Sequence, residues 1–304
     1  MTTTPRDEGT EAQAPAEALD ALLSAARGGD GGASCRLGNL YLEGGAVEQD
    51  VAEAFRWYSL GAAQGNALAQ SHLGTMFLRG TGCRADDDRA VFWFRRSAGQ
   101  GNATGQYNLA RRYLLGEGVA PDPIEAARWF AAAAAQGDLV STYELGTLFR
   151  FGRGVRRDLL TAASLHLIVA RRGVVAAEVS LADCLEELQD VALAGNLTAS
   201  RCLCEMHNLG LGVEESAALT WTWIRWAKEH CRPGGGGDAD SANEVAETYE
   251  FYGQWLSEAD RREGERVLAA LLRPFPRALR ARPLPRVRFK RRGRSGSGGE
   301  KESA

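Results

Sequence analysis

A short set of residues recurs every 36 positions in this chain of 304 residues. The set comprises a Leu, usually followed by Gly, then an aromatic residue, a glycine loop, a Trp and a further Gly. Its clearest members lie in phase: Leu37, Leu73, Leu109 and Leu145; Trp57, Trp93 and Trp129; Gly65, Gly101 and Gly137. A fixed period of this length indicates stacked units that present one long surface rather than a single catalytic pocket.

Each unit predicts two helices and no strand. In the second unit Ala69, Leu73 and Phe77 follow the spacing of an amphipathic helix, which Gly80 ends in a left-handed conformation. The Gly after each Leu allows two helices to approach closely. An Asp stands where each second helix is expected to begin, as its N-cap: Asp50, Asp86, Asp122 and Asp158. The sequence therefore predicts an all-α chain.

The unit resembles the Sel1-like repeat, a relative of the tetratricopeptide repeat. The third copy carries most of that pattern: Leu109, Tyr113, Gly116, Gly118, Val119, Asp122, Ala126, Trp129, Phe130, Ala134, Ala135, Gln136 and Gly137. The resemblance extends over about Ala16 to Glu229, with degenerate stretches. It implies an α-solenoid of about 36-residue units wound as a right-handed superhelix.

The chain divides by composition and by the phase of the repeat. We expect a disordered leader (1–15), a repeat array (16–230) with an irregular unit near 174–196, a Gly-rich linker (231–241), a pair of capping helices (242–272) and a basic disordered tail (273–304).

The resemblance also implies which residues meet a partner, because first helices line the concave side in this class of repeat. The slots one before and two after each Leu vary between copies but stay mostly polar. They hold Arg36, Asn39, His72, Thr75, Asn108, Arg111, Glu144 and Thr147. Residues three apart share a helix face, so these eight form either a partner-binding stripe or an ordinary solvated surface.

The repeated aromatic residues occupy fixed packing slots and are expected in the core. Trp221, Trp223 and Trp226 are less regular, because only Trp223 holds the usual slot. We expect one of the other two to face solvent and to mark a contact patch.

Cys202, Cys204 and His207 share one helix and are the best candidate zinc ligands. Their C-x-C spacing is unusual for zinc, however, and Cys204 and His207 fill the Gly and Tyr slots of the unit. We interpret them as core substitutions and predict no metal and no cofactor. Since no secretory signal is recognisable, the six cysteines are expected to be reduced in a cytoplasmic protein.

Catalytic motifs are missing from the sequence. No G-x-S-x-G, phosphate loop or H-E-x-x-H occurs, so we predict a non-enzymatic protein. A hydrolase built on the repeat family is the less favoured alternative. No apolar run approaches the roughly 20 residues of a transmembrane helix.

The net charge of −3 conceals an asymmetry. Residues 273–304 carry eleven Lys/Arg and two Glu (11 − 2 = +9), which leaves −12 on the first 272 residues. The basic positions of interest are Arg286, Arg288, Lys290, Arg291, Arg292 and Arg294. This tail suggests nucleic-acid or anionic-lipid binding, or nuclear import in a eukaryote; alternatively it binds the acidic body or nothing specific.

Together these features predict a protein-interaction scaffold or adaptor. The array would hold a partner protein or peptide along its concave face, and the polar stripe would select that partner. Regulation through the basic tail is the competing hypothesis.

Overall fold

The computed structural model describes residues 10–45, 47–230 and 257–271. Within them the chain forms helices and no strand. In chain order these are α1 (Thr10–Arg27), α2 (Gly31–Glu43), α3 (Val51–Ala63), α4 (Ala67–Arg79), α5 (Asp87–Gly99), α6 (Ala103–Leu115), α7 (Pro123–Ala134), α8 (Leu139–Phe151), α9 (Leu159–Ala170), α10 (Val175–Ala182), α11 (Leu185–Leu193), α12 (Leu197–Leu209), α13 (Ala217–His230) and α15 (Glu258–Leu271). The predicted all-α solenoid is confirmed.

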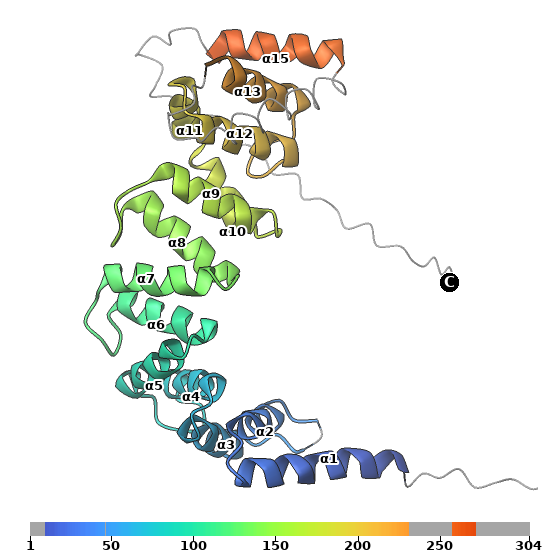
Figure 1. Cartoon of the computed structure of the whole chain (residues 1–304), viewed down its shortest axis with the longest axis vertical. Helices are drawn as coiled ribbons and strands as arrows, with labels where there is room; N and C mark the ends of the chain where they lie inside the picture. The colour runs from blue at the N-terminus through green and yellow to red at the C-terminus, as the bar shows by residue number, and fades with distance from the viewer. Residues whose placement is uncertain (1–9, 46, 231–256, 272–304) are drawn as a thin grey trace, which may run out of the picture.

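Successive helix pairs stack into a long arc that runs from α1 to α15 (Figure 1). Each unit pairs a first helix with a second one, as in α2–α3, α4–α5, α6–α7 and α8–α9, and the second helix packs on the next unit. α4 also contacts the first helices on either side, α2 and α6. Because the inner side of a curved stack is the shorter one, this contact places the first helices on the concave side.

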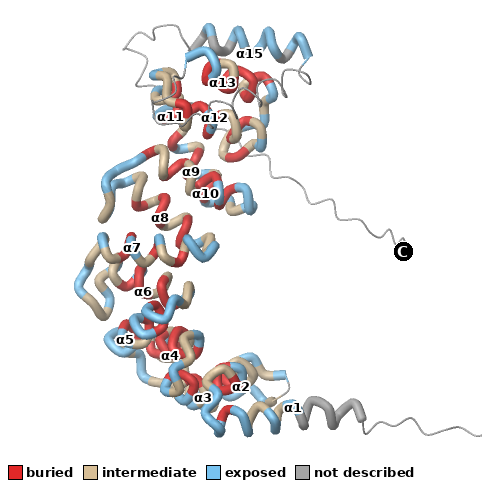
Figure 2. Tube along the Cα trace, viewed as in Figure 1, coloured by how far each residue is buried: buried red, intermediate tan, exposed pale blue. Residues whose placement is uncertain are grey.

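The buried residues do not form a single central core. Buried positions lie between the helices along the whole arc (Figure 2). One aromatic slot of each second helix is filled by Tyr58, Phe94 or Phe130, all fully buried. The repeated Trp residues are half-buried and pack against the buried residues of the units. Trp129, for example, packs against two hydrophobic clusters, one that contains Phe94 and one that contains Phe130. The repeated aromatic residues are therefore core, as predicted.

Glycine next to the repeated Leu makes this packing possible. A Cβ atom on Gly74 would lie 2.7 Å from the Phe94 ring, and one on Gly38 would lie 2.6 Å from the Tyr58 ring. The two helices of a unit thus approach too closely for a side chain at this slot, which confirms the predicted role of the glycine.

The four predicted aspartate caps are confirmed. Each accepts a hydrogen bond from one or two backbone N–H groups in the first turn of the second helix. First helices are capped in the same way, by residues that the sequence analysis did not single out: Asp30, Asn66, Asn102, Asp138 and Asn196. Each of them directly follows a glycine with positive φ, and this Gly-Asn/Asp pair is the signal in the sequence.

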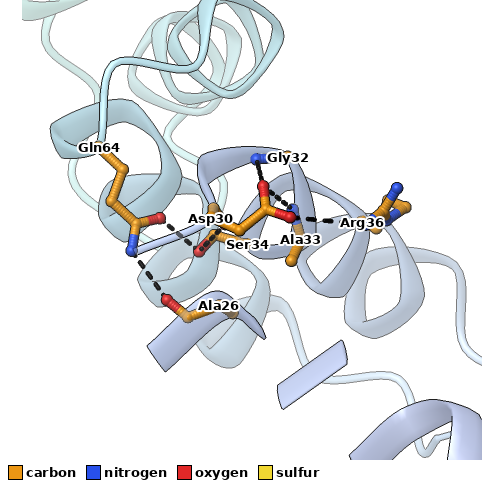
Figure 3. A network of polar contacts seen from close by, with 7 residues as sticks. All are labelled: Ala26, Asp30, Gly32, Ala33, Ser34, Arg36 and Gln64. Carbon is orange, nitrogen blue, oxygen red and sulfur yellow. Dashed lines mark hydrogen bonds and ion pairs between the residues drawn. The ribbon is translucent and has the colours of Figure 1, made fainter. Parts of the chain in front are cut away.

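The repeated Gln has a structural role between units. The Gln64 amide donates to the Ala26 carbonyl at 2.8 Å and its oxygen accepts from the Ser34 hydroxyl at 2.7 Å (Figure 3). In the next units the amide of Gln100 donates to Gln70 at 2.7 Å, and that of Gln136 to Gln106 at 2.7 Å. These bonds connect helix ends, so the Gln side chains contribute to the stacking of the units.

The expected leader is shorter than predicted. Helix α1 begins at Thr10, so the disorder expected for residues 10–15 was wrong. The segment is rich in Glu, Ala and Gln, which favour helix strongly enough to outweigh the single proline there. Residues 1–9 lie outside the described part of the chain.

The irregular unit comprises two short helices, α10 and α11. Neither has a side-chain cap, because Val174 and Cys184 stand at their N-caps. Beyond it, α15 lies within the range expected for the capping helices and packs against α13, with an ion pair between Arg225 and Glu265 at 2.7 Å. The linker and the first capping helix lie outside the described residues.

Candidate partner-binding surface

The first helices leave one face uncovered. All exposed residues of α2, α4, α6 and α8 fall at four positions per helix, spaced by four, three and four residues, which lie on one helix face. The exposed members are Arg36, Glu43, Leu68, Arg79, Thr104, Arg111, Leu115, Val140 and Phe151. We call this set of positions the inner stripe.

The eight predicted site residues all belong to the inner stripe. Arg36 and Arg111 are exposed, whereas the others are half-buried in the centre of the stripe: Asn39, His72, Thr75, Asn108, Glu144 and Thr147. The outer two stripe positions of each helix, five before and six after the repeated Leu, were not among the predicted residues. Continuing the three- and four-residue spacing of the predicted pairs would have found them.

The buried Tyr58 contacts two residues of the inner stripe, Asn39 and His72. The Tyr58 hydroxyl donates to Asn39 Oδ1 at 2.6 Å, and its ring stacks on the His72 ring with centroids 4.9 Å apart. Burial lowers the pKa of His72 below its ordinary value, although the carboxylate of Glu43 opposes this. His72 is thus neutral at pH 7 and offers a hydrogen bond rather than a charge.

Two threonines in the stripe are oriented by their own helices. The Thr75 hydroxyl donates to the Ser71 carbonyl at 3.0 Å, and the Thr147 hydroxyl donates to the Tyr143 carbonyl at 3.1 Å. Each hydroxyl oxygen keeps lone pairs that can accept a hydrogen bond from a partner.

The exposed arginines at positions 36 and 111 of the inner stripe make only weak contacts within the protein. Arg36 lies 4.0 Å from Asp30, and both side chains are largely exposed, so this ion pair is weak (Figure 3). The Arg111 guanidinium lies 5.9 Å from the centre of the Tyr107 ring. Burial raises the pKa of Glu144, and the charge of Arg111 partly offsets that shift. The arginines therefore remain available to an acidic partner.

The unusual tryptophans do not form a surface patch. Trp221, Trp223 and Trp226 are all buried, with 6%, 0% and 5% of their surface exposed. The Trp226 indole donates to the Ala192 carbonyl at 2.8 Å, and its ring stacks on His230 at 3.7 Å. The expectation that one of them faces solvent was wrong, because α13 is covered by α11 and α12 on one side and by α15 on the other.

The candidate zinc residues lie in the core. Cys202 and His207 are buried and Cys204 is half-buried. Burial raises the pKa of the Cys202 thiol to about 11, so it stays protonated at pH 7. No set of three or more His, Cys, Asp or Glu residues in the described ranges is arranged to hold a metal ion.

An open hollow of about 450 Å³ lies on α11, away from the inner stripe. It is lined by Glu187, Asp190, Val191, Ala194, Gly195 and Asn196. It contains no His, Cys or Ser nucleophile, and the lining offers no catalytic arrangement. The six basic tail positions, Arg286 to Arg294, lie outside the described residues, so their role stays a prediction.

Comparison with known proteins agrees with this architecture. A family model described as the Sel1 repeat matches residues 32–66, 67–102, 103–138 and 140–174. Residues 32–174 of the chain thus carry four Sel1 repeats. Its matched segments correspond to the units α2–α3, α4–α5, α6–α7 and α8–α9. Sel1 repeat proteins are in general protein-interaction scaffolds and are generally not catalytic.

Two solved structures are similar to this Sel1 repeat protein. One is a protective antigen of uropathogenic Escherichia coli strains that displays an SLR fold, with 27% identity and a TM-score of 0.54 over 84% of this chain and 64% of the antigen. The chain thus spans less than two thirds of that antigen. The other is a Sel1 repeat protein from Oxalobacter formigenes, with 29% identity and a TM-score of 0.50 over 67% of this chain and 88% of that one.

None of the curated proteins compared with this Sel1 repeat protein matches it. Among the helices of the described residues, none combines the length and the apolar character needed to cross a bilayer.

Proposed function

We propose that this Sel1 repeat protein is a scaffold or adaptor that binds a partner protein or peptide along the concave face of its array. The inner stripe carries this proposal, because it gathers the exposed residues of four successive first helices on one face. Stacking fixes the helices that present it, so a partner binds a preformed surface and little order is lost on the scaffold side.

Recognition would combine anchors and selective polar contacts. The arginines at 36 and 111 provide charged donors, His72 and Asn108 provide neutral hydrogen-bonding groups, and apolar residues at the stripe margins exclude water around them. A surface of this kind extends over several units, so we expect affinity to be distributed over many contacts.

Affinity capture with the full chain tests the proposal. The triple variant Arg36→Ala, His72→Ala, Arg111→Ala removes contacts of the inner stripe from α2, α4 and α6. A matched variant, Arg56→Ala, Arg96→Ala, Arg128→Ala, removes exposed arginines from the second helices α3, α5 and α7. We expect the first to lower recovery of partners about tenfold or more and the second to leave it unchanged. Unchanged recovery with the first variant would reject the stripe.

The competing function is binding of nucleic acid or an anionic surface through the basic tail. Its support is the charge of residues 273–304, a net of +9 from eleven Lys/Arg and two Glu. Deleting these residues from the chain separates the two functions. Binding through the tail would disappear with the deletion and would weaken steeply with salt, whereas binding to the inner stripe would survive the deletion.

A further inference from the structure

The inner stripe is not uniform along the arc, and its gradient suggests the chemistry of the partner. The α6 to α8 part carries three exposed apolar side chains, whereas the α2 to α6 part carries three exposed arginines and one exposed leucine, Leu68. The apolar set of the α6 to α8 part is Leu115, Val140 and Phe151, each 51% to 60% exposed. We call these three the apolar margins. The arginine set is Arg36, Arg79 and Arg111.

Helix α10 lies beside α8. Leu181 keeps the phase of Leu145, and the Tyr143 hydroxyl lies 3.4 Å from the Ser180 hydroxyl. Arg150 is paired with Asp183 at 3.4 Å across the same boundary. The exposed valines of α10, Val175 and Val179, stand six and two positions before Leu181, outside the four stripe positions, so the inner stripe is considered up to α8.

The apolar margins lie on both sides of a polar centre. Leu115 and Phe151 are the last residues of α6 and α8, whereas Val140 lies near the start of α8. Eleven residues of helix, about 16 Å, separate the two ends of this face. Asn108 and Thr147 lie between the margins and offer hydrogen-bonding groups. An extended chain fits this arrangement, because its side chains alternate to opposite sides while its backbone groups face the polar centre.

Charge sets the direction of such a chain. Among the stripe positions of α2, α4 and α6, the arginines outnumber the single acid, Glu43. At the four stripe positions of α8 the charged residue is an acid, Glu144. An acidic segment is therefore attracted to the α2–α6 part of the stripe and not to the α8 part.

We propose that the partner of the inner stripe is an extended segment with an acidic half, bound by the arginines of α2–α6, and an apolar half, bound between the apolar margins of α6–α8. This inference rests on the proposed function and specifies its partner. At about 9 Å or more between neighbouring first helices, α2 and α8 lie at least about 27 Å apart along the arc, which an extended chain spans with at least about eight residues.

A library of displayed random peptides of about 12 residues, selected on the full chain, provides the probe. We expect enriched peptides to contain an Asp/Glu-rich block beside a block of Leu, Ile, Val or aromatic residues. Enrichment of basic peptides, or no enrichment, would overturn the inference.

Binding of an enriched peptide, measured by fluorescence anisotropy, then assigns each half. The variant Val140→Ser, Phe151→Ser is expected to weaken binding at least tenfold. The matched variant Phe92→Ser, Ile124→Ser, which removes exposed apolar residues from the second helices α5 and α7, is expected to have no effect. Equal effects of the two variants would contradict the inference.

The acidic half has its own test. Arg79→Gln, Arg111→Gln is expected to weaken the acidic peptide about tenfold but to leave unchanged a peptide whose Asp/Glu are replaced by Asn/Gln. Equal sensitivity of both peptides would overturn the charge assignment. If the inner-stripe variants abolish partner capture while the library selects no acidic–apolar peptide, only this inference fails. If capture is independent of the stripe, the proposed function fails as well.

Discussion

Two loop glycines that share a positive φ have different structural roles. Gly137 and Gly154 both have positive φ, 88° and 72°. A Cβ on Gly137 would meet nothing within 4 Å, whereas one on Gly154 would lie 2.0 Å from the Pro123 carbonyl oxygen of the neighbouring unit. Gly154 is thus a contact between units as well as a turn.

The pair provides a matched prediction. Gly137→Ala carries only the backbone penalty and is expected to lower the free energy of unfolding by about 1 kcal/mol. Gly154→Ala must also move the preceding unit and is expected to cost at least about 2 kcal/mol more. Urea denaturation followed by circular dichroism measures both, and equal losses would show that the loop adjusts without disturbing its neighbour.

His166 occupies the aromatic slot that Tyr58, Phe94 and Phe130 fill in the earlier units. It is fully buried, and neither ring nitrogen makes a hydrogen bond of normal geometry within the described residues. Burial, together with the charge of Arg150, lowers its pKa to about 4. The His166 imidazole therefore becomes protonated near pH 6.5 in the unfolded chain but only near pH 4 in the folded chain.

The sign of this linkage predicts loss of stability as pH falls from about 6.5 towards 4, by about 2 kcal/mol between pH 7 and 5. His166→Phe, which restores the residue of the second and third units, should remove that part of the pH dependence. Urea denaturation of both proteins at pH 7 and 5 measures the difference. An identical pH dependence would mean that the buried imidazole is accommodated in its charged form.

Among whole helices, α10 lacks the side-chain N-cap that the first helices α4, α6 and α8 possess. Val174 stands in the N-cap slot held by Asn66, Asn102 and Asp138, and its backbone already has the extended conformation of a cap, with φ −84° and ψ 101°. An Asn there can accept a hydrogen bond from the first turn, as the other caps do.

We therefore expect Val174→Asn to raise the free energy of unfolding by about 0.5–1 kcal/mol, with Asn102→Val lowering it by a similar amount. Hydrogen exchange of the α10 amides should slow in the first variant. A destabilised or unchanged Val174→Asn protein would indicate that the side chain of Val174 contributes more by packing than a cap would.

The helices also show what the sequence can and cannot predict. The period, the aspartate caps, the close glycine and the first helices of the stripe follow from local patterns, and the structure contains all of them. The burial of Trp221 and Trp226 does not, because it depends on which helices cover α13. The margins of the stripe, such as Phe151, follow from the spacing of the predicted pairs, but only the arrangement of the helices shows that this face lacks a neighbour.

For the molecule as a whole, the concave face of the array is the surface that we propose for binding of partners. The units have the same helix arrangement, so a position on a first helix can be compared with a position on the second helix that packs beside it. Thr75 and Thr147 lie in the inner stripe of α4 and α8, whereas Arg56 and Arg128 are exposed on the second helices α3 and α7.

Site-specific photo-crosslinking from these four positions in the full chain, in cells that produce it, shows which face meets a partner. A photoreactive phenylalanine at 75 or 147 should form a covalent adduct with a partner protein, and the same residue at 56 or 128 should form none. Adducts of the same partner from 56 and 128, or none from 75 and 147, would contradict binding along the concave face.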